Sequence, residues 1–245
     1  MLLLLHAFPL NHTMWQPQIE ALAPTVPLLA LDYAGFGTSH WYPTTPPNPR
    51  HIDEVAANII AELDRRGIAH VAVAGLSMGG YLALALWRIA PHRITGLAIC
   101  NSRATGDDAA GKATRVRNAH IARDQGAAAL TDAMMPRLLS QYASPALVQQ
   151  VRDLGSQADP EVMANAMLMI AERPDATTLL PTITVPSLVI GATDDPIITV
   201  SDSQAVAGAI PNAHCTILPQ CGHLSNLEYP TQFTAVLQSW LERIH

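Results

Sequence analysis

Ser77 stands in the motif Gly75-Leu76-Ser77-Met78-Gly79-Gly80, between the apolar run 71–74 and the helix-like run 81–89. This order predicts a strand, a tight turn and a helix, with the serine on the turn. On such a turn a strained backbone points the hydroxyl out of the sheet, and small residues two positions away on each side prevent clashes. Ser77 is therefore a candidate nucleophile, although Gly-x-Ser-x-Gly taken alone also fits an ordinary helix start.

A serine nucleophile needs a base, usually an imidazole whose second nitrogen is held by a carboxylate. His223 follows the predicted strand 215–218 and precedes the last predicted helix, in a position typical of a loop at the end of a sheet. Asp194 and Asp195 follow the preceding predicted strand in the same way. Because ligands of open α/β sheets bind outside the carboxyl ends of the strands, Ser77, one of the aspartates and His223 are expected to converge there. A loop histidine without a role is the alternative for His223.

Short apolar runs alternate with segments of helical length along the chain. Continuous apolar strands must be covered on both faces, so this rhythm predicts an α/β fold with a mostly parallel central sheet and helices on both faces. The predicted strands are 2–5, 26–31, 71–74, 94–100, 187–190 and 215–218. The predicted helices outside the region described next are 12–22, 51–66, 79–90, 200–209 and 229–243.

The rhythm changes over residues 103–181, where only helical patterns occur. A structureless loop of this length would be unusual in a compact domain, and apolar residues at helical spacing indicate amphipathic helices. We therefore predict a helical lid at 103–181, inserted into a core made of 1–102 and 182–245. Arg103, directly after a predicted strand, is expected to lie close enough to the serine turn to bind a substrate carboxylate. An ion pair that anchors the lid is the alternative role for Arg103.

Composition and charge restrict the class of protein. Hydrophobic residues make up 49% of the 245 and charged residues 14%, so the chain can bury a core and global disorder is excluded. The 14 Lys and Arg against 20 Asp and Glu give a formal net charge of −6 without a basic run, which argues against a nucleic-acid partner. No apolar stretch reaches the roughly 18 residues of a membrane span, and the run 2–5 is too short for a signal sequence.

The three cysteines, Cys100, Cys215 and Cys221, have no paired spacing. Neither a disulfide framework nor a structural zinc site is expected from them. A reducing, cytoplasmic location therefore fits the sequence best.

Four blocks of the sequence carry a family resemblance: Leu3-Leu4-Leu5-His6-Ala7-Phe8-Pro9, Asp32-Tyr33-Ala34-Gly35-Phe36-Gly37-Thr38-Ser39, the Ser77 turn, and Asp195-Pro196 with Gly222-His223. Together they resemble the α/β-hydrolase superfamily, and specifically its lidded serine esterases related to 3-oxoadipate enol-lactone hydrolases and haloperoxidase-like proteins. The resemblance covers nearly the whole chain, and the order Ser, Asp, His is the one that this type of hydrolase uses. Relatives usually have an antiparallel hairpin before the first strand, and the resemblance implies that this hairpin is missing here.

The resemblance allows two positions for the acid that holds His223. The family pattern has a Gly three residues before the acid, and Gly191 stands three before Asp194. Relatives also place the acid nine residues after the Pro at the strand start and follow it with Pro or a small apolar residue. Counted from Pro186, this second rule selects Asp195, which we prefer, and it leaves Asp194 as a turn or capping residue.

The resemblance also implies an oxyanion hole, formed by two backbone N–H groups that stabilise negative charge on the reacting oxygen. One would be the amide of Met78, next to the nucleophile, and the other the amide of Phe8, in the loop after the first strand. Ala7 stands where relatives commonly have Gly, and it fits if its φ is negative. His6 is expected to be a structural residue of this loop rather than a second base.

These residues and the resemblance imply a serine hydrolase of a carboxylic ester or lactone that uses an acyl-enzyme and no metal or cofactor. Ser77 attacks the carbonyl, His223 transfers the proton, and Asp195 orients the imidazole. Two alternatives stay open: C–C bond hydrolysis or lyase chemistry with the same triad, and a non-enzymatic receptor that traps a small molecule under the lid. A haloalkane dehalogenase is excluded, because that chemistry uses an aspartate at the position of Ser77.

Overall fold

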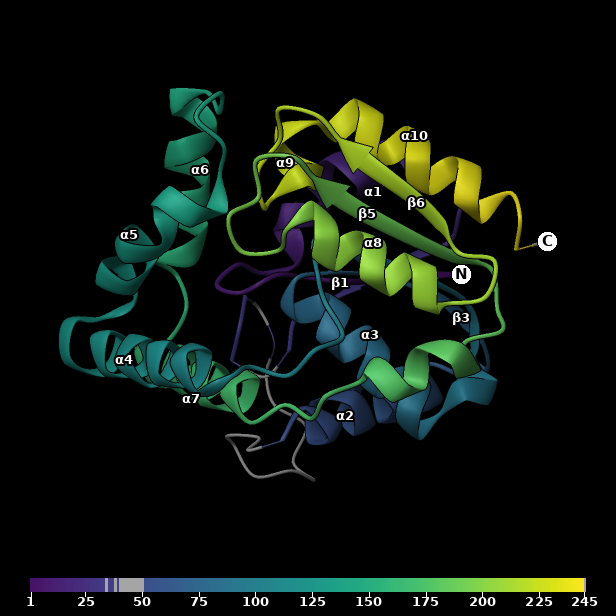
Figure 1. Cartoon of the computed structure of the whole chain (residues 1–245), viewed down its shortest axis with the longest axis horizontal. Helices are drawn as coiled ribbons and strands as arrows, with labels where there is room; N and C mark the ends of the chain where they lie inside the picture. Colours follow the sequence, from purple (N-terminus) through teal and green to yellow (C-terminus); the bar gives the residue numbers. More distant parts are fainter. Residues whose placement is uncertain (34, 38, 40–50, 245) are drawn as a thin grey trace.

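Within residues 1–33, 35–37, 39 and 51–244, which the computed structural model describes, six parallel strands form one central sheet (Figure 1). Along the sheet the strands follow the order β2-β1-β3-β4-β5-β6. Their bounds are β1 Leu2–Leu5, β2 Leu28–Leu31, β3 Val71–Leu76, β4 Ile94–Cys100, β5 Ser187–Ala192 and β6 His214–Leu218. Ala34 and Thr38, in the second block of the resemblance, lie outside the described residues.

The central strands are apolar throughout because side chains pack on both faces of the sheet. In β1, Leu3 and Leu5 belong to one hydrophobic cluster, and Leu2 and Leu4 belong to a second cluster. Since successive residues of a strand point to opposite faces, the two clusters lie on opposite sides of the sheet. Burial on both faces is typical of parallel strands and explains the uninterrupted apolar runs of the sequence.

Helices cover both faces of the sheet (Figure 1). Helices α2, α3 and α8 contribute side chains to the cluster that contains Leu3, whereas α1 and α10 contribute to the cluster that contains Leu2. The predicted α/β class with helices on both faces is therefore confirmed. The bounds are α1 Gln16–Leu22, α2 Ile52–Arg65, α3 Met78–Ile89, α8 Val200–Ala209 and α10 Pro230–Leu241.

The chain between β4 and β5 is helical, as the sequence predicts. Helix α4 packs against α7 and α5 against α6, and the group extends from the end of the sheet toward which the arrowheads of β5 and β6 point (Figure 1). Asp108, Ser144 and Asp159 each accept a backbone hydrogen bond in the first turn of α4, α6 and α7, which fixes where these helices start. The division into a core and a lid at 103 and 182 stays a prediction. The bounds are α4 Ala109–Gln125, α5 Ala127–Leu138, α6 Pro145–Gly155 and α7 Pro160–Ala171.

The predicted parallel sheet is confirmed, and within the described part of the chain every pairing is parallel, with β2 and β6 at the two edges. Several details of the fold differ from the sequence prediction, and two of them concern the sheet and the site. Strand β2 starts at Leu28 and not at 26, because Pro27 has no amide hydrogen to donate; its carbonyl accepts from the Leu2 amide. A short helix that was not predicted, α9 Ser225–Glu228, separates His223 from α10.

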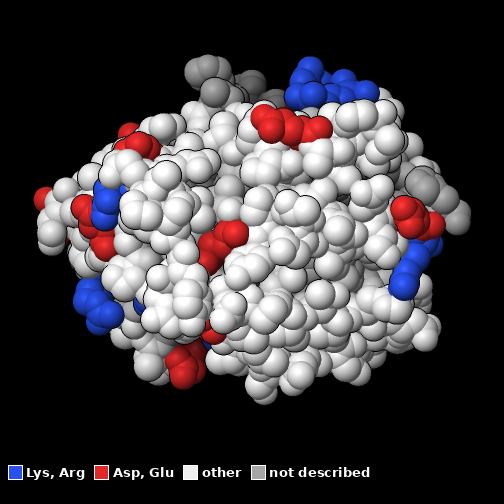
Figure 2. Space-filling model, turned by 90° about the horizontal axis from the view of Figure 1, so that it is seen from above, with Lys and Arg blue, Asp and Glu red and all other residues white. Residues whose placement is uncertain are grey.

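Charged side chains are sparse on the face of the molecule seen in Figure 2. Lys and Arg lie there in a few small groups, Asp and Glu in others, and most of the visible surface is uncharged. This matches the 14% of charged residues in the sequence. Among the residues that the structure describes, no helix is both long enough and apolar enough to cross a membrane.

Candidate active site

Ser77 lies on the turn that joins β3 to α3. Its backbone has φ 56° and ψ −112°, a conformation that costs strain in a residue other than glycine. The Ser77 amide donates to the Cys100 carbonyl (2.9 Å), and the Ser102 hydroxyl donates to the Ser77 carbonyl (2.8 Å). The end of the neighbouring strand β4 therefore holds the turn in its strained form.

The glycines on either side of Ser77 allow this turn to pack closely. A Cβ on Gly75 would lie 2.1 Å from the Gly79 carbonyl oxygen, and a Cβ on Gly79 would lie 2.1 Å from the Leu5 carbonyl oxygen. Both neighbours are backbone atoms, which cannot move aside without shifting a helix or a strand. The same contact places the start of α3 against the end of β1.

Gly79→Ala is expected to destabilise the fold by about 1–3 kcal/mol, because its methyl group would overlap the backbone of β1. Gly208→Ala is the matched control: Gly208 lies in α8, and outside the adjacent backbone of that helix no described atom lies within 4 Å of its Cβ position. Alanine has the higher helix propensity, so this variant should be up to about 1 kcal/mol more stable than the parent. Urea titration gives both free energies of unfolding, and a Gly79→Ala protein as stable as the parent would contradict the packing.

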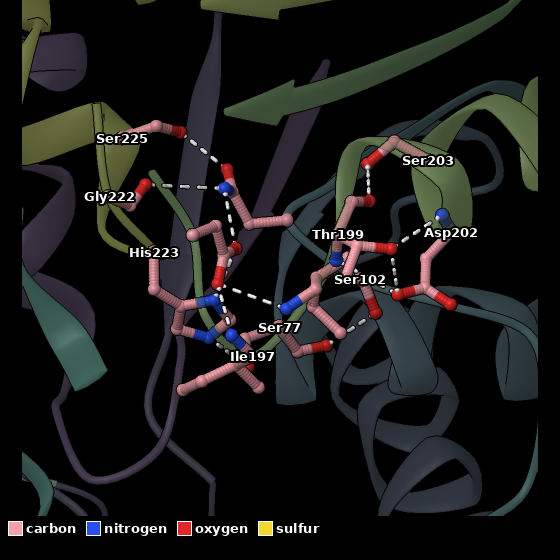
Figure 3. A network of polar contacts seen from close by, with 12 residues as sticks. Ser77, Ser102, Ile197, Thr199, Asp202, Ser203, Gly222, His223 and Ser225 are labelled. Carbon is pink, nitrogen blue, oxygen red and sulfur yellow. Dashed lines mark hydrogen bonds and ion pairs between the residues drawn. The ribbon is translucent and has the colours of Figure 1, made fainter. Parts of the chain in front are cut away.

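The side chain of His223, which Figure 3 shows beside Ser77, connects the serine to Asp195. Its Nε2 lies 2.8 Å from Ser77 Oγ, and its Nδ1 lies 2.7 Å from Asp195 Oδ2. With the proton on Nδ1, the ring donates to Asp195 and leaves Nε2 to accept from the serine hydroxyl. The exposed fractions of the two side chains are 1% for His223 and 0% for Asp195. The loops after β3, β5 and β6 thus bring Ser77, Asp195 and His223 together, with the histidine between the serine and the aspartate. A serine that is activated as a nucleophile needs contacts of this kind.

Asp195, rather than Asp194, contacts the histidine. The backbone amides of Ile197 and Ile198 donate to Asp195 Oδ1 at 2.8 Å and 3.0 Å. These bonds hold the carboxylate oxygen that does not contact His223. Asp194 is exposed, and its carboxylate accepts from the Thr193 hydroxyl (3.0 Å). The structure therefore places Asp194 at the surface of the turn and Asp195 inside it.

The environment of Asp195 favours its ionised form. Burial alone would raise the pKa of this carboxyl. The charge of His223 and hydrogen bonds from His223, Ile198 and Asn101 lower the pKa more, so it lies below its ordinary value. An ionised carboxylate at this position can stabilise an imidazolium.

Sequence analysis missed Asn101, a buried residue directly after β4. Its Nδ2 donates to Asp195 Oδ2 (3.0 Å), and its Oδ1 accepts from the Ser225 hydroxyl (2.5 Å). Its φ is 43°, a left-handed conformation that asparagine adopts more readily than most residues, and its amide donates to the Ile190 carbonyl (2.7 Å). The available signal was the position of Asn101, which directly follows the carboxyl end of a predicted strand, as Ser77 does.

The two amides predicted to form an oxyanion hole belong to adjoining segments. Met78 is the first residue of α3, so its amide has no acceptor within that helix. Phe8 lies in the loop after β1, the strand against which Gly79 packs. Ala7 is not among the described residues with positive φ, so alanine fits where relatives have glycine. Binding of an oxyanion by these amides stays a prediction.

His6 is buried in the same loop and has partners there. Its ring stacks on Tyr33 with 3.9 Å between centroids, and its Nδ1 lies 3.1 Å from the Ala7 carbonyl. The Tyr33 hydroxyl donates to the His6 carbonyl (2.7 Å). Burial lowers the pKa of His6 to about 4, so the ring is neutral at neutral pH. These contacts are those of the structural residue that the sequence led us to expect.

Arg103 forms an ion pair in the helical segment. Its Nη2 lies 2.8 Å from Asp107 Oδ1, and Asp107 also pairs with Arg115 (3.1 Å) and Arg173 (2.9 Å). Arg103 and Asp107 line a cavity of about 370 Å³ that is bordered by α4, α5 and Ile197. The ion pair expected under the alternative role of Arg103, that of anchoring the helical segment, is therefore present. Contact of Arg103 with a substrate carboxylate stays a prediction.

Comparison with known proteins gives one family and several similar structures. The sequence matches the model of the alpha/beta hydrolase family over residues 2–236. It is 29% identical to 3-oxoadipate enol-lactonase 2 of Acinetobacter baylyi, over 96% of this chain and 86% of that protein.

Two solved structures extend this similarity to three dimensions. A thermophilic esterase from Thermogutta terrifontis, with malate bound, has a TM-score of 0.93 at 33% identity and matches over 100% of this chain and 90% of its own. The enol-lactonase from Burkholderia xenovorans LB400 has a TM-score of 0.90 at 30% identity, over 98% of this chain and 90% of its own. The similarity thus spans both the sheet and the helical segment between β4 and β5.

Proposed function

The chain belongs to the alpha/beta hydrolase family, and on this premise we propose that it is a serine hydrolase that cleaves a carboxylic ester or a lactone. The observation that carries the proposal is the series of contacts from Ser77 through His223 to Asp195. Similar proteins that are named as an enol-lactonase and an esterase support it.

In the proposed acylation step, Ser77 Oγ attacks the carbonyl carbon of the substrate while His223 Nε2 takes the hydroxyl proton. The tetrahedral intermediate collapses by breaking the bond from carbon to the leaving oxygen, which receives the proton from His223. Ser77 is left as an acyl ester. With a lactone the leaving oxygen stays on the acyl chain, so the same step opens the ring.

In the proposed deacylation step, a water molecule attacks the acyl ester and gives its proton to His223. His223 then returns a proton to Ser77 Oγ, which leaves as the carboxylic acid product forms. Asp195 stays ionised through both steps and stabilises the imidazolium. One water is consumed for each bond cleaved, and these steps use neither a metal nor a cofactor.

The negatively charged oxygen of the tetrahedral intermediate is proposed to accept hydrogen bonds from the backbone amides of Met78 and Phe8. Loss of one such donor typically costs about 3–4 kcal/mol of transition-state stabilisation. The positive end of the α3 dipole also stabilises the negative charge on this oxygen, because Met78 begins that helix.

The proposed substrate is a small molecule, in keeping with the names of the similar proteins. Arg103 is proposed to contact a carboxylate of that molecule. The cavity that Arg103 lines also contains Arg115, Arg117 and Arg137, and these outnumber the one acidic residue of its lining, Asp107. The esterase from Thermogutta terrifontis was solved with a dicarboxylate, malate, bound.

A fluorophosphonate probe tests whether Ser77 is an activated nucleophile. Attack of Ser77 Oγ on phosphorus displaces fluoride, so intact mass should show one phosphonyl group on the parent and none on Ser77→Ala. Equal labelling of the two proteins would place the reactive group elsewhere. A folded parent that stays unlabelled would contradict the proposal and favour the receptor of the same fold.

Turnover of a substrate panel separates the proposed reaction from its alternatives. The parent is expected to hydrolyse members of a set of p-nitrophenyl esters and lactones. A C–C bond hydrolase would be labelled by the probe and would cleave a vinylogous 1,5-diketone in preference to the esters. A receptor would show slow turnover and tight retention of the product.

A further inference from the structure

The loop that carries His223 packs directly on the end of helix α5. The Leu224 amide donates to the carbonyl of Leu138, the last residue of α5 (3.0 Å). On the other side of the histidine, a Cβ on Gly222 would lie 2.5 Å from the amide nitrogen of Ser140, so glycine is needed for this approach. The residues before and after His223 therefore both contact the chain at the end of α5.

The carboxylate of Glu228 bridges the same two segments. Glu228 is the last residue of α9, which lies at the end of the sheet that faces α5 and α6 (Figure 1). Its Oε1 accepts from the Gly222 amide (3.0 Å), and its Oε2 accepts from the Ser140 hydroxyl (2.5 Å). The Ser140 amide donates to both oxygens, at 3.2 Å and 3.1 Å. The Glu228 side chain thus binds both Gly222, which precedes His223, and Ser140, which lies just after α5.

A carboxylate suits this place because three donors converge on it. Two backbone N–H groups and one hydroxyl group point at the two oxygens of Glu228. A glutamine would offer one oxygen and turn an NH₂ group toward at least one of these donors, which would leave a buried donor without an acceptor. Burial raises the pKa of the Glu228 carboxyl above its ordinary value, whereas the hydrogen bonds from Ser140 and Gly222 favour the ionised form, which accepts stronger bonds than a neutral group.

We propose that Glu228 is a positioning residue for His223: it fixes the histidine loop to the end of α5, so that the position of the helical segment is transmitted to the contact between His223 and Ser77. This inference rests on the proposed function, because it needs His223 to act as the base. Glu228 contacts neither Ser77 nor the imidazole in the network described above, and it acts through Gly222. The alignment of His223 with Ser77 thereby depends on the position of α5.

Glu228→Gln tests this inference, since it keeps the size of the side chain and removes one acceptor. With an ester that the parent hydrolyses, kcat is expected to fall about 10- to 100-fold and KM to change less than about threefold. The rate of Ser77 phosphonylation should fall by the same factor, because it also needs the base. Complete labelling counts the active sites, so a merely structural role would lower that count and leave the rate per site unchanged.

Two further variants complete the experiment. Glu172→Gln makes the same change at an exposed glutamate that pairs with Lys112, and it should leave both rates unchanged. Ser140→Ala removes one hydrogen bond to Glu228, is expected to lower kcat about 3- to 10-fold, and decides the question if Glu228→Gln does not fold.

Each outcome bears on a different proposal. Rates per site that match the parent in Glu228→Gln, or in Ser140→Ala where the first variant does not fold, would overturn this inference alone, because the parent would still be labelled. A parent that is not labelled would overturn the proposed function and this inference with it.

Discussion

Replacement of Ser77 by alanine is expected to lower kcat/KM for hydrolysis of an ester or lactone by about 10⁴- to 10⁶-fold. The variant loses the oxygen that is proposed to form the acyl-enzyme, while His223, Asp195 and the two amides of the proposed oxyanion hole stay in place. Alanine also has the same backbone restrictions as serine, so the strained turn at φ 56° should form in the variant. Steady-state kinetics with the fastest substrate of the panel measure the loss.

Ser102→Ala is the matched control for this prediction. Its hydroxyl is the one that donates to the Ser77 carbonyl, and its loss removes a single neutral hydrogen bond. Such a bond contributes about 0.5–1.5 kcal/mol, which corresponds to at most about a tenfold effect. Losses of similar size in Ser77→Ala and Ser102→Ala would indicate damage to the turn instead of loss of a nucleophile.

Asp195→Asn is expected to lower kcat by about 10⁴-fold and to leave KM nearly unchanged. The amide has almost the shape of the carboxylate, so His223 stays in place. An amide cannot stabilise the imidazolium, and its NH₂ group favours the tautomer in which Nε2 carries the proton and cannot accept from Ser77. Kinetics and the rate of phosphonylation should fall together.

Asp194→Asn makes the same substitution one residue earlier and should change kcat less than about threefold. Asp194 is exposed and accepts from the Thr193 hydroxyl, and an asparagine oxygen can accept that bond as well. A large fall in kcat for Asp194→Asn, together with an active Asp195→Asn, would show that Asp194, which stands three residues after Gly191, is the acid. That result would also contradict the contact between Asp195 and His223.

The elements that position the site could be predicted because their signals are local. Burial on both faces made β1 and β4 continuous apolar runs, and the structure begins and ends both where the sequence predicts. Helix α8 was predicted at 200–209, and a capping box between Thr199 and Asp202 fixes its start. The serine turn was recognisable from its local Gly-x-Ser-x-Gly pattern, although only Gly75 is required by a contact within a few residues of Ser77; Gly79 packs on the Leu5 carbonyl of β1.

The polar residues around the site could not be predicted, since their partners are distant in the chain. Asn101 contacts Asp195 at a separation of 94 residues, and Glu228 contacts Ser140 at 88. Helix α9 has four residues, too few for a periodic pattern. The choice between Asp194 and Asp195 depended on one position, and neighbouring residues of a turn point their side chains in different directions. Only the packed loop distinguishes them.

The contact between His223 and Ser77 joins residues that are 146 positions apart in the chain. Such a contact forms only after the parallel strands between them have paired, and pairing at long sequence separation is slow because loop closure costs entropy first. A partly folded chain therefore holds Ser77 without the histidine that is proposed to be its base. The rate at which reactivity toward a fluorophosphonate returns during refolding consequently reports the completion of the whole fold, not the formation of any one helix or strand.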